Sequence, residues 1–300
     1  MKIVITIFIL PTELNALKNR LMDLQLSSEY ISGINYEFSI MMGMSDYIVD
    51  WGSSKVTKEW VLEEFDKLKP LTSWASKSTF QTRDDALGSL SCKRITIAEH
   101  PDATHFIWTD SDIIFGVEHL FYIENAINGI TTNTNCTEYI ISPEIVRIWD
   151  STWDCLVADK YITEDIGYHL IHDPFKDSGI VGDISLVRVI NNINGQPITK
   201  FGAGMFNCIS KPLLDRIPIP ESMGHYGSGD DTFIMHSIDK LNKIHGDKIF
   251  QFKLKNLVMC ENWTVSENEI LKENIKMIDR RDEFKKQVKS NFQREYSNLN

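Results

Sequence analysis

The alternation of strand-like apolar runs with helical patterns, which starts at the second residue, is the feature that most constrains the fold of this chain. Residues 2–10 (KIVITIFIL) form a continuous apolar run rich in Ile and Val, as expected of a parallel strand covered on both faces. Leucines at helical spacing follow over residues 14–24. Strand patterns and helix patterns continue to alternate along the rest of the chain. It predicts an α/β fold with a mostly parallel sheet flanked by helices.

Periodicity and turn residues place the other elements. Further strands are expected at residues 34–42, 105–109, 138–146, 200–210 and 248–259, and helices at 56–70, 86–97, 118–127, within 218–241 and at 266–295, the last being amphipathic. Residues 150–200 have no clear period and are expected to form a long functional loop region. With no repeat or linker before the terminal helix, we expect one domain over residues 1–262 and a C-terminal helical extension over 263–300.

Composition and charge limit the function classes. Of 300 residues, 42% are hydrophobic and 24% charged, which is typical of a globular protein. The net charge of −11 counts against a protein that coats nucleic acid. Residues 271–300 nevertheless hold eight Lys/Arg against five Asp/Glu, a local +3. This basic end could contact an anionic membrane or could be a solvated helix face.

The cysteines and the apolar runs indicate the cellular location. The five cysteines are scattered without a C-x-x-C pair, which favours reduced thiols and a cytoplasmic protein. Residues 2–10 are followed directly by Pro11, Thr12 and Glu13, so we interpret them as a core strand and not as a signal peptide. No other apolar run approaches the roughly 18 residues of a membrane helix, and no transmembrane segment is expected.

Two carboxylates interrupt the apolar run at 106-FIWTDSDIIFG-116. Asp110 and Asp112 follow a predicted buried strand, and ligands of open α/β sheets bind outside the carboxyl ends of the strands. Side chains two residues apart in an extended segment point the same way, so both carboxylates can converge on one hard cation. Oxygen ligands suit Mg²⁺ or Mn²⁺. The alternative is that Asp-Ser-Asp caps the helix or turn that follows.

A family resemblance rests on these residues and on two other stretches. A strand ending in Asp-Ser-Asp, preceded by 83-RDDALGSLSCKR-94 and followed far downstream by 227-GSGDDTFIM-235, resembles the nucleotide-sugar-dependent glycosyltransferases of the GT-A fold, a Rossmann-type architecture. The resemblance covers about residues 1–260 as an order of elements, with two short specific motifs. It implies a donor half over about residues 1–116 and an acceptor half over about 117–262.

By this resemblance, the donor side consists of Pro11, Arg83, Asp110, Ser111 and Asp112. Asp110 would lie near the donor ribose and the metal, Asp112 would ligate the metal, and Arg83 would lie near the diphosphate or base. GT-A enzymes often add a histidine ligand after a late strand. This chain has 260-CENW-263 there, so Glu261 or Asn262 is the candidate oxygen ligand in its place.

On the acceptor side, the resemblance makes Asp230 and Asp231 the candidates for contact with the acceptor hydroxyl. In an inverting enzyme one of them would be the general base. Helix capping is the alternative, because Ser228-x-x-Asp231 fits a helix-start signature. Glycines allow the backbone to approach a sugar closely. The expected acceptor-lining residues are Gly204, His225, Gly227 and Gly229.

The sequence therefore predicts a metal-assisted hexosyl- or pentosyltransferase that uses a nucleoside-diphosphate sugar, most simply a UDP-sugar, with Mn²⁺ or Mg²⁺. Its acceptor would be a glycan, a lipid-linked saccharide or hydroxymethylated viral DNA. Two alternatives stay open. Asp-Ser-Asp could serve a metal-dependent phosphohydrolase or nucleotidyltransferase, since such pairs support phosphate chemistry generally. The chain could also be a non-catalytic sugar-binding protein of the same fold.

Overall fold

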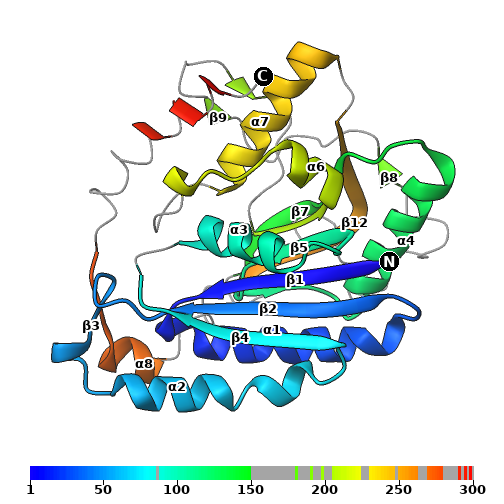
Figure 1. The fold of residues 1–300 in the computed structure, drawn as a ribbon. Coiled ribbons are helices and arrows are strands. Elements are labelled where there is room, and N and C mark those ends of the chain that lie inside the picture. Colours follow the sequence, from blue (N-terminus) through cyan, green and yellow to red (C-terminus); the bar gives the residue numbers. More distant parts are fainter. Residues whose placement is uncertain are drawn as a thin grey trace.

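A computed structural model describes residues 1–85, 88–149, 180–181, 190–191, 197–198, 205–223, 230–246, 249–262, 269–279, 290–291, 294–295 and 297–298. Its main sheet has nine strands (Figure 1): β1 (Lys2–Ile9), β2 (Asn35–Gly43), β4 (Lys77–Arg83), β5 (His105–Thr109), β6 (Ile113–Ile114), β7 (Tyr139–Trp149), β8 (Ile180–Val181), β11 (Phe206–Ser210) and β12 (Phe250–Asn262). The helices are α1 (Leu14–Ser27), α2 (Lys58–Asp66), α3 (Ser89–Glu99), α4 (His119–Asn133), α6 (Lys211–Arg216), α7 (Asp230–His245) and α8 (Glu269–Asn274).

The order of the strands is β4-β2-β1-β5-β11-β7-β12-β6, and β8 pairs with β12. The first four of these strands are parallel to one another. Strand β11 is antiparallel to both of its neighbours, β12 is parallel to β7, and β6 is antiparallel to β12. The sheet is therefore mixed but mostly parallel, as the alternating sequence pattern predicts.

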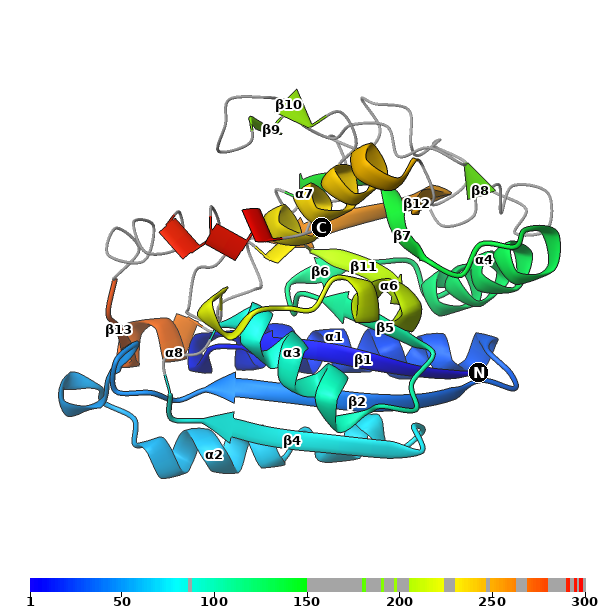
Figure 2. The same cartoon turned by 45° about the horizontal axis from the view of Figure 1, so that its top comes forward.

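Helices cover both faces of the sheet (Figures 1 and 2). Strand β1 shows why its apolar run is continuous: Ile3, Ile5 and Ile7 belong to one buried cluster and Val4 to another. Successive side chains of a strand point to opposite faces, so both faces of β1 need apolar residues. The first cluster contains side chains of α1, α2, α4 and α8, and the second contains those of α3, α6 and α7.

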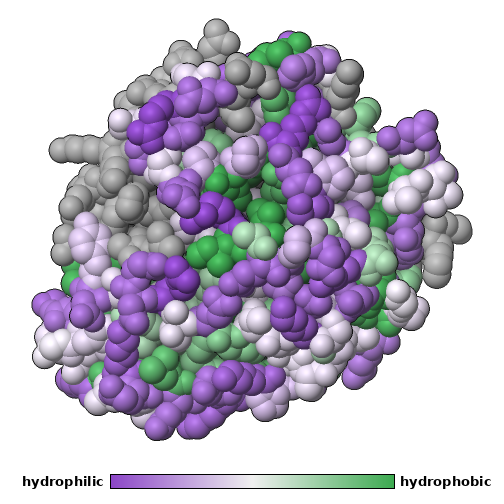
Figure 3. All heavy atoms as spheres, viewed as in Figure 1, coloured by the Kyte–Doolittle hydropathy of each residue, from purple (hydrophilic) through white to green (hydrophobic). Residues whose placement is uncertain are grey.

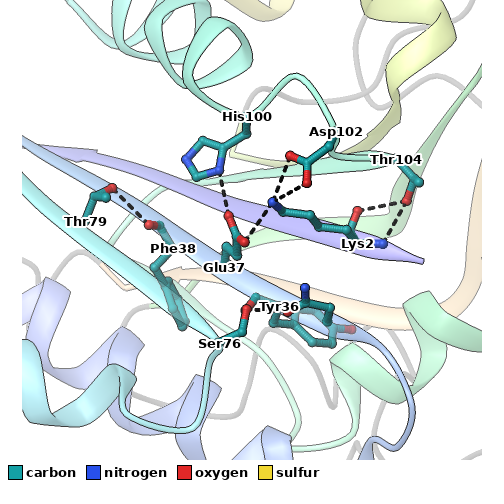
Figure 4. A network of polar contacts seen from close by, with 10 residues as sticks. Lys2, Tyr36, Glu37, Phe38, Ser76, Thr79, His100, Asp102 and Thr104 are labelled. Atoms are coloured by element: carbon teal, nitrogen blue, oxygen red, sulfur yellow. Dashed lines mark hydrogen bonds and ion pairs between the residues drawn. The ribbon is translucent and has the colours of Figure 1, made fainter.

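A polar network joins the amino ends of β1 and β2 (Figure 4). Lys2 Nζ lies 2.8 Å from Glu37 Oε1 and 2.9 Å from Asp102 Oδ1. His100 donates through Nδ1 to Glu37 Oε2 at 2.7 Å. Because parallel strands have all their amino ends at one edge, this network lies at the edge opposite the strand ends that carry the predicted site.

Two predictions need correction. Residues 77–83, which carry no apolar run, form the edge strand β4, and the helix expected from residue 86 begins at Ser89. The predicted helix over residues 266–295 is not continuous, because α8 ends at Asn274 and is followed by strand β13 (Lys276–Met277), which pairs with β3 (Val49–Asp50). Leu271 and Ile275 are buried in the cluster of α1 and α2. Their apolar side chains face the body of the protein.

Residues 150–200 lie outside the described residues except for β8 and a small pair of strands, β9 (Ile190–Asn191) and β10 (Pro197–Ile198). The expectation of a long functional loop there stays a prediction. In the described part of the chain, no helix is long and apolar enough to cross a membrane.

Candidate functional site

The predicted donor residues lie at or just after the carboxyl ends of three parallel strands. Strand β1 ends at Ile9, two residues before Pro11, β4 ends at Arg83, and β5 ends at Thr109. The pairing of β1 with β2 and β5, and of β2 with β4, is parallel throughout. The topology therefore brings these segments, which are up to about one hundred residues apart in sequence, to one edge of the sheet.

Asp110, Ser111 and Asp112 form the turn between β5 and β6. The backbone N–H of Asp110 donates to Met205 O at 2.9 Å, which extends the pairing of β5 with β11 by one residue. Ser111 is buried at 4% exposure, whereas the two aspartates are partly exposed. Ser111 thus faces the interior and leaves the carboxylates at the surface of the edge.

This geometry excludes helix capping by Asp-Ser-Asp. The next element is the short strand β6, and helix α4 begins only at His119, with Glu118 at its N-cap position. Six residues therefore separate Asp112 from the first residue of the helix. A role in the turn itself is compatible with ligand binding, since a turn at a strand end exposes its side chains.

Strand β6 brings the far end of β12 beside Asp112. Ile113 pairs with Glu261 and Ile114 with Cys260 in antiparallel register, so one further step of that register would set Asn262 opposite Asp112. The backbones of both candidate third ligands are therefore adjacent to the Asp-Ser-Asp turn. Of these two residues the structure describes the backbone alone. Among the described side chains, no group of three or more His, Cys, Asp and Glu forms a metal site.

The oxygen atoms available as metal ligands nevertheless suit a hard divalent cation. Asp110 and Asp112 provide carboxylate oxygens at one strand end, and the backbone of residues 261 and 262, a glutamate and an asparagine, runs beside the same turn. Mg²⁺ and Mn²⁺ prefer oxygen ligands, and Mg²⁺ commonly keeps water and substrate phosphate in the rest of its coordination sphere. One or two protein carboxylates are sufficient for such a site.

Arg83 lies at the end of β4 with its guanidinium tied to a neighbouring carboxylate. Its Nη2 donates to Asp85 Oδ2 at 2.7 Å, and this bond raises the pKa of Arg83. The buried Nε of the same side chain has no hydrogen-bond partner. An unpaired buried N–H of a cation is costly. A phosphate oxygen would satisfy it.

The backbone beside Arg83 is unusually crowded, and sequence reasoning missed this. Gly43, at the end of β2, pairs with Arg83. A Cβ atom there would lie 3.1 Å from the Ile48 side chain and 3.2 Å from that of Phe8. A larger residue would require the Ile48 and Phe8 side chains to shift at the end of the sheet. The sequence signal is a single glycine after the apolar run 34–42.

The start of the chain's first loop and its C-terminal segment meet at the same edge. Pro11 is buried in the 3-10 helix η1 (Pro11–Glu13), and α8 contacts this helix. Lys55 N donates to Asn274 O at 2.8 Å, and Ile278 N donates to Ile48 O at 3.0 Å. The C-terminal segment over residues 269–279 therefore packs beside the predicted donor residues. No sequence pattern predicts this long-range contact.

The acceptor-side predictions are only partly covered by the described residues. Asp230 and Asp231 are the first two residues of α7, which agrees with the predicted helix start. Acidic residues at this position also interact favourably with the helix dipole. The predicted acceptor-lining residues lie outside the described residues: Gly204, His225, Gly227 and Gly229.

Comparison with known proteins was made for sequence and structure. No family model and no curated protein sequence matches the chain. Among solved structures, S. aureus TarS 1–349 in complex with UDP-GlcNAc matches with a TM-score of 0.51 and 12% identity, over 100% of this chain and 68% of that one. GalNAc-T7 with UDP, GalNAc and Mn²⁺ matches with a TM-score of 0.48 and 10% identity, over 87% and 43% of the two chains.

The chain covers 37% of the length of a longer S. aureus TarS structure. At 12% identity, the similarity to TarS 1–349 concerns the fold. It confirms the predicted GT-A-like α/β architecture, with a mostly parallel mixed sheet between layers of helices.

Proposed function

We propose that the protein is a metal-assisted glycosyltransferase that moves a sugar from a nucleoside-diphosphate sugar, most simply a UDP-sugar, to an acceptor hydroxyl. The observation that carries the proposal is the placement of Asp110 and Asp112 at the end of β5, beside Glu261 across the pairing of β6 with β12. In a GT-A-like sheet this is the edge where a bound diphosphate and a cation would meet.

Each donor-side residue has a role that follows from its position. Asp112 and Asp110, with Glu261 or Asn262, would hold Mn²⁺ or Mg²⁺. A divalent ion bound there supplies Lewis-acid stabilisation of the negative charge on the leaving diphosphate. The unpaired Nε of Arg83 offers a charge-assisted hydrogen bond to a phosphate oxygen. We propose that buried Ser111 and buried Pro11 shape the turns that follow β5 and β1.

On the acceptor side we propose that Asp230 or Asp231 contacts the acceptor hydroxyl. A general base must come within hydrogen-bond reach of the proton that it removes, and the first turn of α7 is where both carboxylates are anchored. We propose that Gly204, His225, Gly227 and Gly229 line the path of the acceptor.

The acceptor classes differ in the surface that they need. A saccharide needs a neutral polar surface, and a lipid-linked saccharide needs contact with a membrane. Hydroxymethylated DNA needs basic residues, which the net charge of −11 does not favour. The face seen in Figure 3 is largely hydrophilic, and the apolar residues Leu271 and Ile275 are buried. Any peripheral membrane contact of the C-terminal extension would therefore not use Leu271 or Ile275.

The test is thermal stability with UDP, other nucleoside diphosphates and UDP-sugars, each with and without Mn²⁺ or Mg²⁺. A ligand at about a hundred times its Kd adds about 2.7 kcal/mol to the free energy of unfolding. We expect a metal-dependent increase with UDP or one UDP-sugar, followed by transfer when an acceptor is added. Release of phosphate from the nucleotide without any acceptor would favour the phosphohydrolase instead. Absence of any nucleotide effect would refute the proposal.

A further inference from the structure

A buried arginine lies behind the turn that carries Asp110 and Asp112. Arg20, from α1, has 1% of its surface exposed. Its guanidinium carbon lies 4.9 Å from the centroid of the Phe115 ring, and its Nη2 lies 3.2 Å from His119 Nε2. Phe115 comes three residues after Asp112, and only the two residues of strand β6 lie between them.

The histidine completes a chain of contacts to the backbone just after β6. His119 Nδ1 lies 2.9 Å from Gly116 O, and a carbonyl oxygen can only accept, so Nδ1 carries the proton. His119 Nε2 is then the acceptor for Arg20 Nη2. The imidazole also stacks on Phe115 at 4.8 Å between centroids, and Phe206 meets the Phe115 ring edge-on, also at 4.8 Å. Residues 115–119 are thus fixed by one cation, one hydrogen-bond chain and three rings.

The fold alone does not require a cation at this position. Arg20 Nε and Nη1 are buried without a hydrogen-bond partner. Burial lowers the pKa of Arg20 to about 10, which leaves the side chain charged at neutral pH, and partly buried Asp23 offsets only part of that cost. Apolar residues of similar volume often replace buried charges with neutral or favourable effects on stability. A buried charge that is costly to the fold suggests a functional role for the residues that it contacts.

The position of Asp112 depends on the contact between Arg20 and Phe115, because strand β6, between Asp112 and Phe115, is short. It pairs with β12 through two residues, Ile113 and Ile114. A one-residue slip of a strand moves every side chain to the opposite face of the sheet. For Asp112, which directly precedes β6, such a slip would aim its carboxylate away from Asp110. Two residue pairs hold a register weakly, so the packing of Phe115 is what anchors it.

We propose that Arg20 is a positioning residue for the divalent-cation site. Through Phe115 and His119 it fixes the register of β6, and this sets Asp110 and Asp112 to converge on one cation. The inference rests on the proposed function, because the cation site is part of it. The ligands affected would be the divalent metal and the diphosphate bound with it.

The test is calorimetric titration of UDP into the full chain, with and without Mn²⁺, which gives the factor by which Mn²⁺ tightens UDP binding. Arg20→Met keeps the apolar volume and removes the charge and the hydrogen bond to His119. We expect it to reduce this factor at least fivefold and to change UDP affinity without metal by less than twofold. Arg20→Lys keeps a cation near Phe115 and should recover part of the factor.

Glu37→Gln is the matched control, because it perturbs a buried ion pair at the opposite edge of the sheet (Figure 4). We expect it to lower the melting temperature and leave the factor unchanged. A wild-type factor in Arg20→Met, or equal losses with and without Mn²⁺, would show that Arg20 is merely structural. A wild-type chain whose UDP binding ignores Mn²⁺ would instead overturn the metal site of the proposed function, and the positioning role with it.

Discussion

At the residue scale, the metal-binding proposal depends most on the Asp112 carboxylate. Asparagine has nearly the same shape but no charge, so Asp112→Asn should remove the electrostatic attraction for the cation and retain the turn. We expect the Mn²⁺-dependent part of UDP binding to disappear while the melting temperature without ligand changes little. Asp102→Asn, at the opposite edge of the sheet, is the control with normal binding. Normal turnover in Asp112→Asn would end the metal assignment.

Gly43 provides a second test at this scale. In Gly43→Ala the new methyl would meet Ile48 at 3.1 Å and Phe8 at 3.2 Å. Inserting an atom into a packed site costs typically about 1–3 kcal/mol. Urea denaturation should show that loss in the free energy of unfolding. Gly52→Ala is the matched control, since its new methyl would have only one neighbour, Asp50 Oδ1 at 3.6 Å. Equal stabilities of the two variants would contradict this account.

At the scale of elements, sequence patterns predict those strands and helices whose burial leaves a local periodicity of apolar residues. Strand β1 is buried on both faces and helix α1 on one, and these burial patterns produce the apolar run and the leucine spacing in the sequence. Both elements form where the sequence predicts them. Strand β4 has no such signal, because it is an edge strand whose residues are mostly half-buried or exposed. The pairing of β6 with β12 joins residues about 150 positions apart. Only the assembled sheet brings residues 261 and 262 to Asp112, so the sequence could name them as candidates but could not place them.

The C-terminal segment allows a prediction for an element. Leu271, in α8, has 1% of its surface exposed and belongs to the cluster that also contains α1 and α2. Leu→Ala at a fully buried site costs about 2–5 kcal/mol. We expect a loss of this size for Leu271→Ala in urea denaturation, within a single transition. The neighbouring Glu273 is exposed, and Glu273→Ala should change the free energy of unfolding little. A small loss in Leu271→Ala would favour the predicted division of the chain at residue 262.

At the scale of the whole molecule, the two hydrophobic clusters bury ionisable groups that link folding to pH. Burial lowers the pKa of His105 to about 4. Burial, with the adjacent Arg20, holds the pKa of His119 well below its ordinary value. Both histidines bind protons more weakly in the folded chain than in the unfolded chain. Their contribution to stability is therefore complete above about pH 6.5 and is lost as the pH falls below that value.

His105 isolates this effect. Its Nε2 lies 2.6 Å from the Tyr139 hydroxyl and its Nδ1 lies 3.0 Å from Thr104 Oγ1, so His105→Gln can keep one hydrogen bond while removing the titrating group. One histidine contributes up to about 1.4 kcal/mol per pH unit between its two pKa values. Urea denaturation from pH 6.5 to 4.5 should therefore show a shallower loss of stability in His105→Gln than in the wild type. Carboxylates titrate equally in both proteins and cancel in the difference.

The matched control for that series is His245→Gln, because His245 is exposed at the end of α7 and water reaches it in both states. We expect its stability to follow the wild-type dependence on pH. If His105→Gln also kept the wild-type slope, water would reach the His105 imidazole in the folded chain, and the packing of β5 against Tyr139 would be looser than the structure indicates. A steeper slope in His105→Gln would contradict the sign of the linkage itself. The amino half of β5, the strand that leads to Asp110, would then need a different account of its stability.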